Sequence, residues 1–188
     1  MTGRLQSFIA AVRHITDGSI EETRLLDSVQ DAMRTLVAAD DWLPTALAVP
    51  HPQHYQQYLL HSDPCSRFSI VSFVWGPGQQ TPIHDHTVWG VIGMLRGAEL
   101  SQAYRLCAEG LAPQGGPQRL EPGQVTTVSP RIGDIHRVAN AFADRVSISI
   151  HAYGADIGRT RRRVFNPLTG TAREFISGYA NAAIHCRD

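Results

Sequence analysis

Apolar residues in the first third of the chain recur at the spacing of amphipathic helices. A first stripe, in which every member lies three or four positions from another, consists of Phe8, Ile9, Val12 and Ile15. A second stripe consists of Leu25, Leu26, Val29, Met33, Leu36 and Val37. This period predicts two helices that each bury one face. Pro44 and Pro50 follow, so we expect the helical part to end there and to cover one side of a sheet.

A capping box is expected where the second helix begins. In Ser19-Ile20-Glu21-Glu22, the Ser19 hydroxyl and the Glu22 carboxylate stand three positions apart. At this spacing each can accept a hydrogen bond from an open backbone N–H group of the first helical turn. We therefore predict that the second helix starts at this motif.

From about residue 54 the pattern changes to short apolar or alternating runs, each bounded by Gly, Pro, Asn or Asp. Such runs predict β-strands. They are Tyr55–Leu60, Phe68–Trp75, Thr87–Leu95, Glu99–Leu106, Gln124–Val128, Ile135–Ala139, Val146–Tyr153 and Arg163–Phe165. Turn signals occur at Gly76-Pro77-Gly78, Gly115-Gly116, Glu121-Pro122-Gly123 and Asn166-Pro167. Seven or eight strands with no helical pattern between them indicate an antiparallel sandwich or barrel.

Length and composition fit one globular domain. The chain has 188 residues, 43% hydrophobic and 18% charged, which is ordinary for a folded protein with a sizeable core. We expect residues 1–188 to form a single domain, with 1–50 as a helical cap and 54–188 as a β-barrel.

Charge and apolar runs exclude several classes of partner. Seventeen basic residues balance seventeen acidic ones, so no global field favours nucleic acid or an anionic membrane. No stretch approaches the length of a membrane span, and the first fifteen residues lack the apolar run of a signal peptide. The three cysteines are unevenly spaced and suggest no disulfide scaffold. We therefore expect a cytoplasmic protein that binds neither nucleic acid nor membrane.

Three histidines suggest a metal site. His84 and His86, in Pro82-Ile83-His84-Asp85-His86-Thr87, would share one face of an extended strand, with Asp85 on the other face. His136 follows downstream, in Gly133-Asp134-Ile135-His136. Asp85 is expected to be an ion-pair partner outside the site. An isolated His-x-His pair is weak evidence for a metal, so the surrounding spacing decides.

That spacing resembles the paired motifs of the cupin superfamily. The first block consists of Gly78, His84, His86, Gly90 and Gly97. The second consists of Pro130, Gly133, His136 and Asn140, with one extra residue between Pro130 and Gly133. The resemblance implies a mainly β protein with N-terminal helices, whose strands form the cupin double-stranded β-helix, or jelly-roll barrel. Such a barrel would bring His136 opposite the His-x-His pair.

One departure from the cupin pattern affects the metal. Gly90 stands where many cupins carry a glutamate ligand, so the expected ligand set is three neutral imidazoles with no carboxylate. Imidazole suits zinc, copper, iron and nickel alike, so the spacing does not name the metal. Two or three coordination positions would stay open, and the uncompensated dication would favour an anionic chelating substrate such as a thiolate or a carboxylate.

A narrower resemblance is to the thiol dioxygenases, and within them to the bacterial 3-mercaptopropionate dioxygenases, often grouped as cysteine dioxygenase type I. The stretches that carry it are Tyr55-Gln56-Gln57-Tyr58-Leu59, Phe73-Val74-Trp75-Gly76-Pro77-Gly78, His84-Asp85-His86-Thr87-Val88-Trp89-Gly90 and Ser149-Ile150-His151-Ala152-Tyr153-Gly154. The resemblance implies that His84, His86 and His136 hold one Fe(II) per chain. It also implies that both atoms of O2 are added to a substrate thiol, which gives a sulfinate.

Ser149, His151 and Tyr153 alternate along one expected strand and would face the same side. A hydroxyl, an imidazole and a phenol in line could form a hydrogen-bonded relay that directs the Tyr153 proton toward a metal. The resemblance assigns these positions to a triad that orients substrate and oxygen. The alternative is that Ser149 and His151 are satisfied core polar residues and Tyr153 is packing.

Two positions bear on the substrate. Gln57 stands where mammalian-type cysteine dioxygenases have an arginine that pairs with the substrate carboxylate. Gly90 stands where they have a cysteine cross-linked to the active-site tyrosine, so Tyr153 should be an unmodified phenol. The resemblance to glutamine-type relatives implies an arginine in the pocket near the end of the barrel. Arg162 is the candidate for that role, with Arg161 and Arg163 facing the other way if the segment is extended.

We therefore expect an Fe(II) thiol dioxygenase that takes a small thiol and O2 and prefers 3-mercaptopropionate. The alternatives are a cysteine dioxygenase that forms cysteine sulfinate, and a non-catalytic metal-binding cupin that acts as a ligand-binding or sensor module. Arg162 and Gln57 are the expected substrate-binding residues. Trp89 could wall the pocket, although a large aromatic residue more often lies in the core. The sequence leaves the oligomeric state open.

Overall fold

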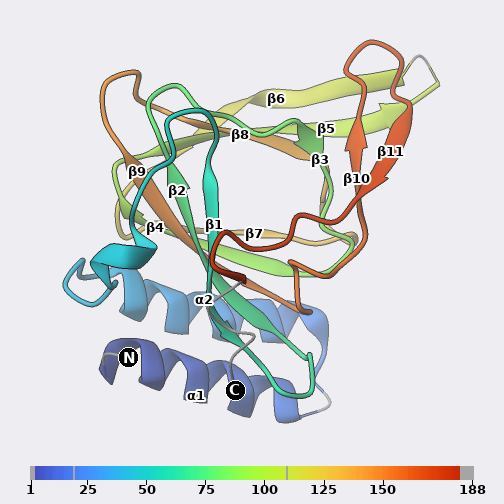
Figure 1. Ribbon diagram of the computed structural model, residues 1–188. Helices are drawn as coiled ribbons and strands as arrows, with labels where there is room; N and C mark the ends of the chain where they lie inside the picture. Colours follow the sequence, from blue (N-terminus) through green and yellow to red (C-terminus); the bar gives the residue numbers. More distant parts are fainter. Residues whose placement is uncertain (1–2, 19, 109, 183–188) are drawn as a thin grey trace.

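A computed structural model describes residues 3–18, 20–108 and 110–182, with helices first and strands after them (Figure 1). The helices are α1 (Gly3–Asp17), α2 (Glu22–Val37) and the short 3-10 helix η1 (Thr45–Leu47). The strands are β1 (Gln56–Ser62), β2 (Ser69–Trp75), β3 (Ile83–His84), β4 (Gly90–Arg96), β5 (Glu99–Cys107), β6 (Gly110–Leu120), β7 (Val125–Val128), β8 (His136–Asn140), β9 (Ser147–Tyr153), β10 (Arg162–Phe165) and β11 (Ala172–Phe175).

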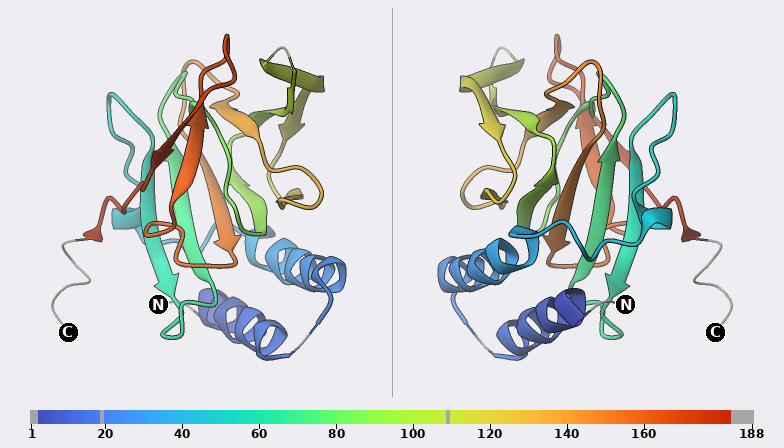
Figure 2. Two further views of the ribbon diagram at one scale, coloured as in Figure 1. Left: turned by 90° about the vertical axis from the view of Figure 1, so that its right-hand side faces the viewer. Right: turned by 90° about the vertical axis from the view of Figure 1, so that its left-hand side faces the viewer.

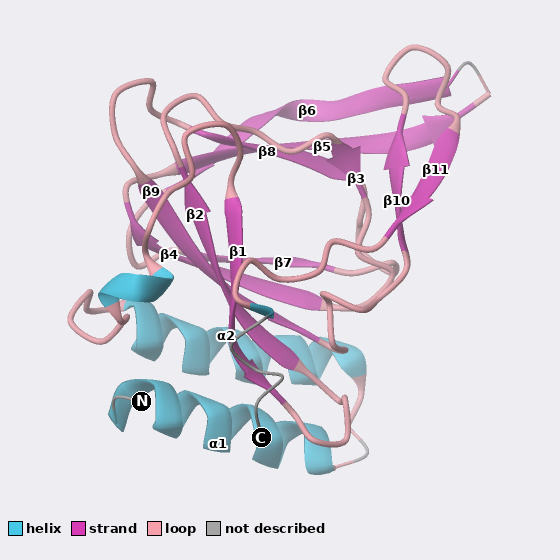
Figure 3. Cartoon of the chain, viewed as in Figure 1, coloured by secondary structure: helices cyan, strands magenta, loops and turns pink. Residues whose placement is uncertain are grey.

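The strands form two antiparallel sheets that face each other around a closed interior (Figures 1 and 3). The first sheet has the order β1-β2-β9-β4-β7, and the second has the order β11-β10-β3-β8-β5-β6. Both helices lie side by side against the outer face of the first sheet (Figure 2). The predicted fold class is confirmed: the protein is mainly β, with two N-terminal helices and a jelly-roll barrel of two antiparallel sheets. None of the described helices is long and apolar enough to span a membrane.

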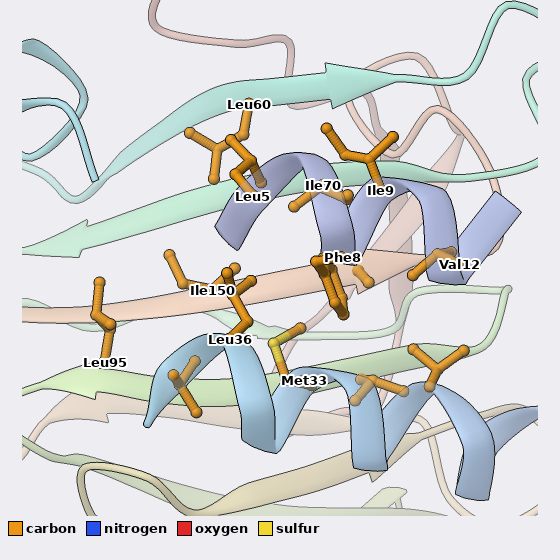
Figure 4. Close-up of a cluster of buried hydrophobic side chains, with 14 of the residues drawn as sticks. Leu5, Phe8, Ile9, Val12, Met33, Leu36, Leu60, Ile70, Leu95 and Ile150 are labelled. Atoms are coloured by element: carbon orange, nitrogen blue, oxygen red, sulfur yellow. The ribbon is translucent and has the colours of Figure 1, made fainter. Parts of the chain in front are cut away.

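The central strands of the first sheet are buried on both faces. Every residue of β2 and β9 is buried, because one face packs on the helices and the other faces the barrel interior. Ile70 and Ile150 belong to the helix-facing core, whereas Phe73 and Tyr153 belong to the interior core. In the helix-facing core, α1 contributes Leu5, Phe8, Ile9 and Val12, and α2 contributes Met33 and Leu36 (Figure 4). The apolar stripes read from the sequence are therefore the faces that cover this sheet.

Helix α2 approaches β4 at Gly93. A Cβ atom at Gly93 would lie 2.6 Å from Cγ of Met33 and 2.9 Å from Cγ1 of Val37. These distances are shorter than real van der Waals contacts, so the absence of a side chain at Gly93 lets the helix rest directly on the sheet.

Two strands were not expected from the sequence. β6 contains Pro113, Gly115 and Pro117, and the Gly115-Gly116 turn signal lies inside it. It tolerates these residues because it is an exposed edge strand, where a missing backbone N–H group breaks no buried ladder. Its pairing with β5 is irregular in this region, and Gly115 has a φ of 62°. The expected turn is therefore a bulge within a hairpin. β11 is the other unexpected strand.

Helix α2 starts at the last residue of the predicted motif, but Glu22 does not take part in the expected capping box. Ser19 lies outside the described residues, and helix α2 starts at Glu22 with Glu21 as its N-cap and no side-chain cap hydrogen bond. The Glu22 carboxylate accepts a hydrogen bond from the Ser129 hydroxyl and lies 3.6 Å from Nε of Arg131. It therefore ties the helix to the barrel instead of closing its own first turn.

Gly93→Val should destabilise the protein by about 1–3 kcal/mol, because the added side chain must push α2 away from β4. Chemical denaturation measures the change in the free energy of unfolding. Gly116→Val is the matched control, since nothing lies within 4 Å of a Cβ there, and its effect should stay within about 0.5 kcal/mol. Equal effects at the two glycines would contradict this account of the helix–sheet contact.

Candidate metal centre

Three buried histidines converge inside the barrel. His84, in β3, pairs in register with His136 of β8, and His86 lies two residues beyond His84. The centroids of the three rings are 4.8–4.9 Å apart, and one potential ligand nitrogen from each ring lies within 4.8 Å of the others. The strand β3 ends at His84, so the expected extended strand through both histidines is shorter than predicted. Antiparallel pairing of β3 with β8 nevertheless closes the site.

Each ring is held through its Nδ1 atom. The partners are the Pro82 carbonyl oxygen for His84 at 3.1 Å, Oδ1 of Asp134 for His86 at 2.9 Å, and Oγ of Ser101 for His136 at 3.1 Å. A carbonyl or carboxylate oxygen can only accept, so Nδ1 of His84 and of His86 carries the proton. Their Nε2 lone pairs are therefore free to bind a metal, as in other metal sites where the second ring nitrogen is fixed by the protein.

Burial keeps the imidazoles of His84 and His136 neutral. It lowers the pKa of His84 to about 3, and the neighbouring His86 acts in the same direction. Burial likewise lowers the pKa of His136 well below its usual value, with smaller contributions from His84 and His86. Neutral rings with free Nε2 atoms are the donors that a divalent transition metal requires. The donor set therefore fits a transition metal such as iron, with three protein ligands.

Asp134 supports the site and was missed by the sequence reasoning. Besides Nδ1 of His86, its carboxylate accepts hydrogen bonds from the backbone N–H groups of His86 at 3.1 Å and Thr87 at 2.9 Å. Thr87 has a φ of 63°, a left-handed conformation that these bonds help to hold. Burial acts to raise the pKa of Asp134, but the hydrogen bonds that its carboxylate accepts from His86 and Thr87 lower it overall. The available signal was an acidic residue two positions before the third histidine.

Ser149, His151 and Tyr153 point into the barrel from β9 and form a continuous hydrogen-bonded chain. Oγ of Ser149 lies 2.8 Å from Nε2 of His151, and Nδ1 of His151 lies 2.8 Å from the Tyr153 hydroxyl. The Trp75 indole N–H donates to Oγ of Ser149 at 3.1 Å. The Tyr153 ring stacks on His86, with 5.3 Å between centroids. The structure thus brings the three residues together beside the metal ligands.

Burial strongly shifts the pKa values of Tyr153 and His151, two members of this hydrogen-bonded chain. It raises the pKa of the Tyr153 phenol above its usual range and lowers the pKa of His151 well below its usual value. Tyr153 is therefore a neutral hydrogen-bonding group and His151 a neutral imidazole. Gly90 adjoins the ring: a Cβ atom there would lie 2.8 Å from Cδ1 and Cε1 of Tyr153. No side chain at residue 90 fits beside Tyr153 in its present position.

Arg162 and Gln57 are both buried and both contact the segment that follows β11. The Arg162 guanidinium lies 4.7 Å from the centre of the Phe175 ring and donates to Oγ of Ser177 at 2.6 Å. Nε of Arg162 has no hydrogen-bond partner among the described residues. Nε2 of Gln57 donates to the Gly178 carbonyl oxygen at 3.3 Å. This segment, which encloses Arg162, carried no signal in the sequence reasoning.

The neighbours of Arg162 face the other way, as alternation predicts. Arg161 forms an exposed ion pair with Glu174 at 2.8 Å, and Arg163 pairs with the buried carboxylate of Asp85 at 2.6 Å. Asp85 is therefore an ion-pair partner outside the metal centre, as expected. Trp89 packs on the helix-facing core, as is usual for a large aromatic residue.

Comparison with known families matches residues 5–163 to the family described as cysteine dioxygenase type I. The chain belongs to this family. It is an oxidoreductase, a thiol dioxygenase with a three-histidine site that takes a small thiol and O2.

Several solved structures match this chain at low sequence identity. A protein with a double-stranded β-helix domain from Klebsiella pneumoniae is 14% identical, with a TM-score of 0.47, and covers 69% of this chain and 91% of its own. A cupin superfamily protein from Desulfitobacterium hafniense is 16% identical, with a TM-score of 0.46, and covers 61% and 90%. A cupin 2 domain-containing protein from Halorhodospira halophila is 16% identical, with a TM-score of 0.47, and covers 63% and 74%.

Asp134→Asn should weaken iron binding by about 10- to 100-fold, because the amide cannot hold His86 as the carboxylate does. Competition against a metal chelator measures the affinity without any turnover. Asp144→Asn is the control, since Asp144 is exposed and pairs only with its neighbour Arg145. Unchanged metal affinity in Asp134→Asn would show that Asp134 does not orient His86.

Proposed function

We propose that this thiol dioxygenase oxidises a small thiol carboxylate, with 3-mercaptopropionate favoured over cysteine, to its sulfinate. One Fe(II) per chain is held by His84, His86 and His136. The observation that supports this substrate class is Arg162: it is buried and has no carboxylate within ion-pair distance among the described residues, whereas Arg161 and Arg163 each have one. A desolvated guanidinium without a counter-ion is costly, so it should attract an anionic substrate group.

Arg162 is suited to a carboxylate by its chemistry. The planar guanidinium can form two parallel hydrogen bonds to a carboxylate, and both strengthen in a buried site. Its present contacts, to the Ser177 hydroxyl and the Phe175 ring, orient the group without neutralising it. Gln57 is held by the same segment and could add a neutral hydrogen bond.

The preference for 3-mercaptopropionate follows from the groups near the metal ligands. Cysteine differs by an α-ammonium group, which needs an anionic or strongly accepting partner. The carboxylate nearest the ligands, Asp134, already accepts three hydrogen bonds from His86 and Thr87. Among the described residues, no free carboxylate stands beside Arg162 to receive an ammonium group. Cysteine is therefore the weaker substrate in this proposal.

When bound, ferrous iron supplies the place where the thiol sulfur and dioxygen meet, and the redox chemistry that joins them. The protein supplies position and proton control. Tyr153 stacks on His86, so its hydroxyl is placed to donate a hydrogen bond beside the metal ligands. His151 and Ser149 fix the orientation of that hydroxyl. Because Gly90 offers no thiol, Tyr153 acts as an unmodified phenol.

Arg162→Gln should lower kcat/KM for 3-mercaptopropionate by roughly thirtyfold or more, equivalent to about 2 kcal/mol, because a buried charge pair is lost. Oxygen consumption and sulfinate formation by iron-loaded protein measure this with 3-mercaptopropionate, cysteine and cysteamine. Cysteamine lacks a carboxylate, so it should be the poorest substrate and the least affected. Arg161→Gln is the control. Higher kcat/KM for cysteine than for 3-mercaptopropionate would establish the alternative substrate.

Tyr153→Phe should keep iron and lose most turnover, because the phenol donates a proton or hydrogen bond without binding the metal. His136→Ala should lose iron, because it removes one of three ligands. Metal analysis and oxygen consumption separate the two effects. Tyr104→Phe, a tyrosine on β5 outside the site, is the control. An iron-free or fully active Tyr153→Phe protein would contradict the role given to Tyr153.

A further inference from the structure

The hydrogen-bonded chain from Tyr153 leads to a carboxyl group that the proposed function does not use. Glu99, in β5, is 2% exposed and lies beside Ser149, at the far end of the chain from Tyr153. Its Oε2 atom has no hydrogen-bond partner within the part of the chain that the structure describes. A buried carboxyl group with an open oxygen is costly unless its proton or its charge serves the protein.

A cavity of about 220 Å³ reaches Glu99 from the side of β5, β6 and β7. Its lining includes Glu99 together with exposed residues of the edge strand β6, such as Gly116 and Gln118. Neither Arg162 nor Gln57 lines it. The cavity therefore gives Glu99 a route to solvent that is separate from the proposed carboxylate-binding residues.

Burial raises the pKa of Glu99 to about 7, while hydrogen bonding by the Ser149 hydroxyl acts in the opposite direction. Three ionisable residues line the cavity: Arg119 of β6, Asp134 just before β8, and His136 of β8. His151 and Tyr153 of β9 are the ionisable members of the hydrogen-bonded chain. The facing residues of β4 and β7, Ile92, Thr126, Thr127 and Val128, carry no ionisable group. Arg119 is engaged by Glu121 and by the Phe142 ring. Glu99 can therefore change its protonation at neutral pH.

The state of Glu99 dictates the direction of every hydrogen bond in the chain. When Glu99 is ionised it can only accept, so the Ser149 hydroxyl donates to it, Nε2–H of His151 donates to Ser149, and the Tyr153 hydroxyl donates to Nδ1. When Glu99 is protonated it donates to Ser149, and each following bond reverses. His151 then carries its proton on Nδ1, and the Tyr153 hydroxyl is free to donate into the site.

We propose that Glu99 is a positioning residue that receives, through Ser149, His151 and Tyr153, the proton lost by the substrate thiol, and thereby turns the Tyr153 hydroxyl toward the thiolate. This inference rests on the proposed thiol oxidation. It assigns a proton acceptor to the thiol, which must ionise before its sulfur can act as a thiolate ligand.

The transfer balances one proton at each position. The S–H bond breaks and its proton joins the Tyr153 oxygen, whose own proton moves to Nδ1 of His151. The proton on Nε2 moves to Ser149, and the Ser149 proton moves to the Glu99 carboxylate. Tyr153 and His151 end neutral, no electron is transferred, and Glu99 later releases its proton through the cavity.

The tautomer of His151 tests the coupling without any turnover. Nitrogen-15 NMR of the full chain loaded with zinc, a diamagnetic stand-in for iron, should show the proton on Nδ1 well below pH 7 and on Nε2 well above it. Glu99→Gln should show the same His151 tautomer at every pH, because the amide neither gains nor loses a proton in this range. Glu121→Gln, the same change at an exposed site, should behave as wild type. A wild-type tautomer that does not change across this range overturns the proposal.

The pH profile of kcat/KM with iron-loaded protein gives a second measurement. Wild-type activity should rise as pH increases through about 7, because ionised Glu99 is the form that accepts a proton. Glu99→Gln should lose about a hundredfold at neutral pH. Its activity should then rise only near the ionisation of the free thiol, at about pH 8.5 or above. Glu99→Asp keeps a carboxylate, so it should restore the rise in kcat/KM at pH values near neutrality.

These two measurements separate this proposal from the proposed function. If the tautomer changes with pH but the wild-type protein oxidises no thiol, the proposed substrate class is wrong and the coupling of Glu99 to His151 stands. If thiols are oxidised and Glu99→Gln keeps the wild-type pH profile, the role of Glu99 is overturned.

Discussion

Burial of the first sheet on both faces is the constraint from which the site follows. Because α1 and α2 cover the outer face of this sheet, every second residue of β2 and β9 must point into the barrel. A shift of one residue in strand register would exchange the helix-facing and the interior-facing side chains. Ser149, His151 and Tyr153 occupy inward positions of β9. Their alignment is therefore a consequence of helix packing on the other side of the strand.

The second sheet supplies the metal ligands under a looser constraint. Its outer strands are short or exposed, and β3 has only two residues. Precision comes instead from hydrogen bonds to Nδ1 of each histidine, with Asp134 also holding the left-handed turn at Thr87. The barrel thus combines a sheet buried on both faces, which carries the hydrogen-bonded chain of β9, with a second sheet in which a separate hydrogen bond orients each histidine.

Buried polar groups in the interior divide into two sets. Arg162 lies on the side enclosed by the segment after β11, while Glu99 lies beside the cavity under β6. Among the described residues, Arg162 has no anionic partner and Glu99 has an oxygen without a hydrogen bond, and both conditions are costly for a buried group. Arg162 and Glu99 lie on either side of the histidines, since β10 and β5 flank β3 and β8, so the proposed carboxylate site and the proposed proton acceptor are separate.

The sequence by itself determined the two amphipathic helices, most strands, the three histidines and the inward alternation of β9, because all of these rest on local period or on motif spacing. β6 could not be predicted, because its proline and glycine residues usually indicate turns. The strand tolerates them because it lies at the edge of its sheet, which only the tertiary structure shows. Asp134 and Glu99 gained their roles only in the tertiary structure. Their partners lie 48 and 50 residues away, and only folding decides which distant groups meet.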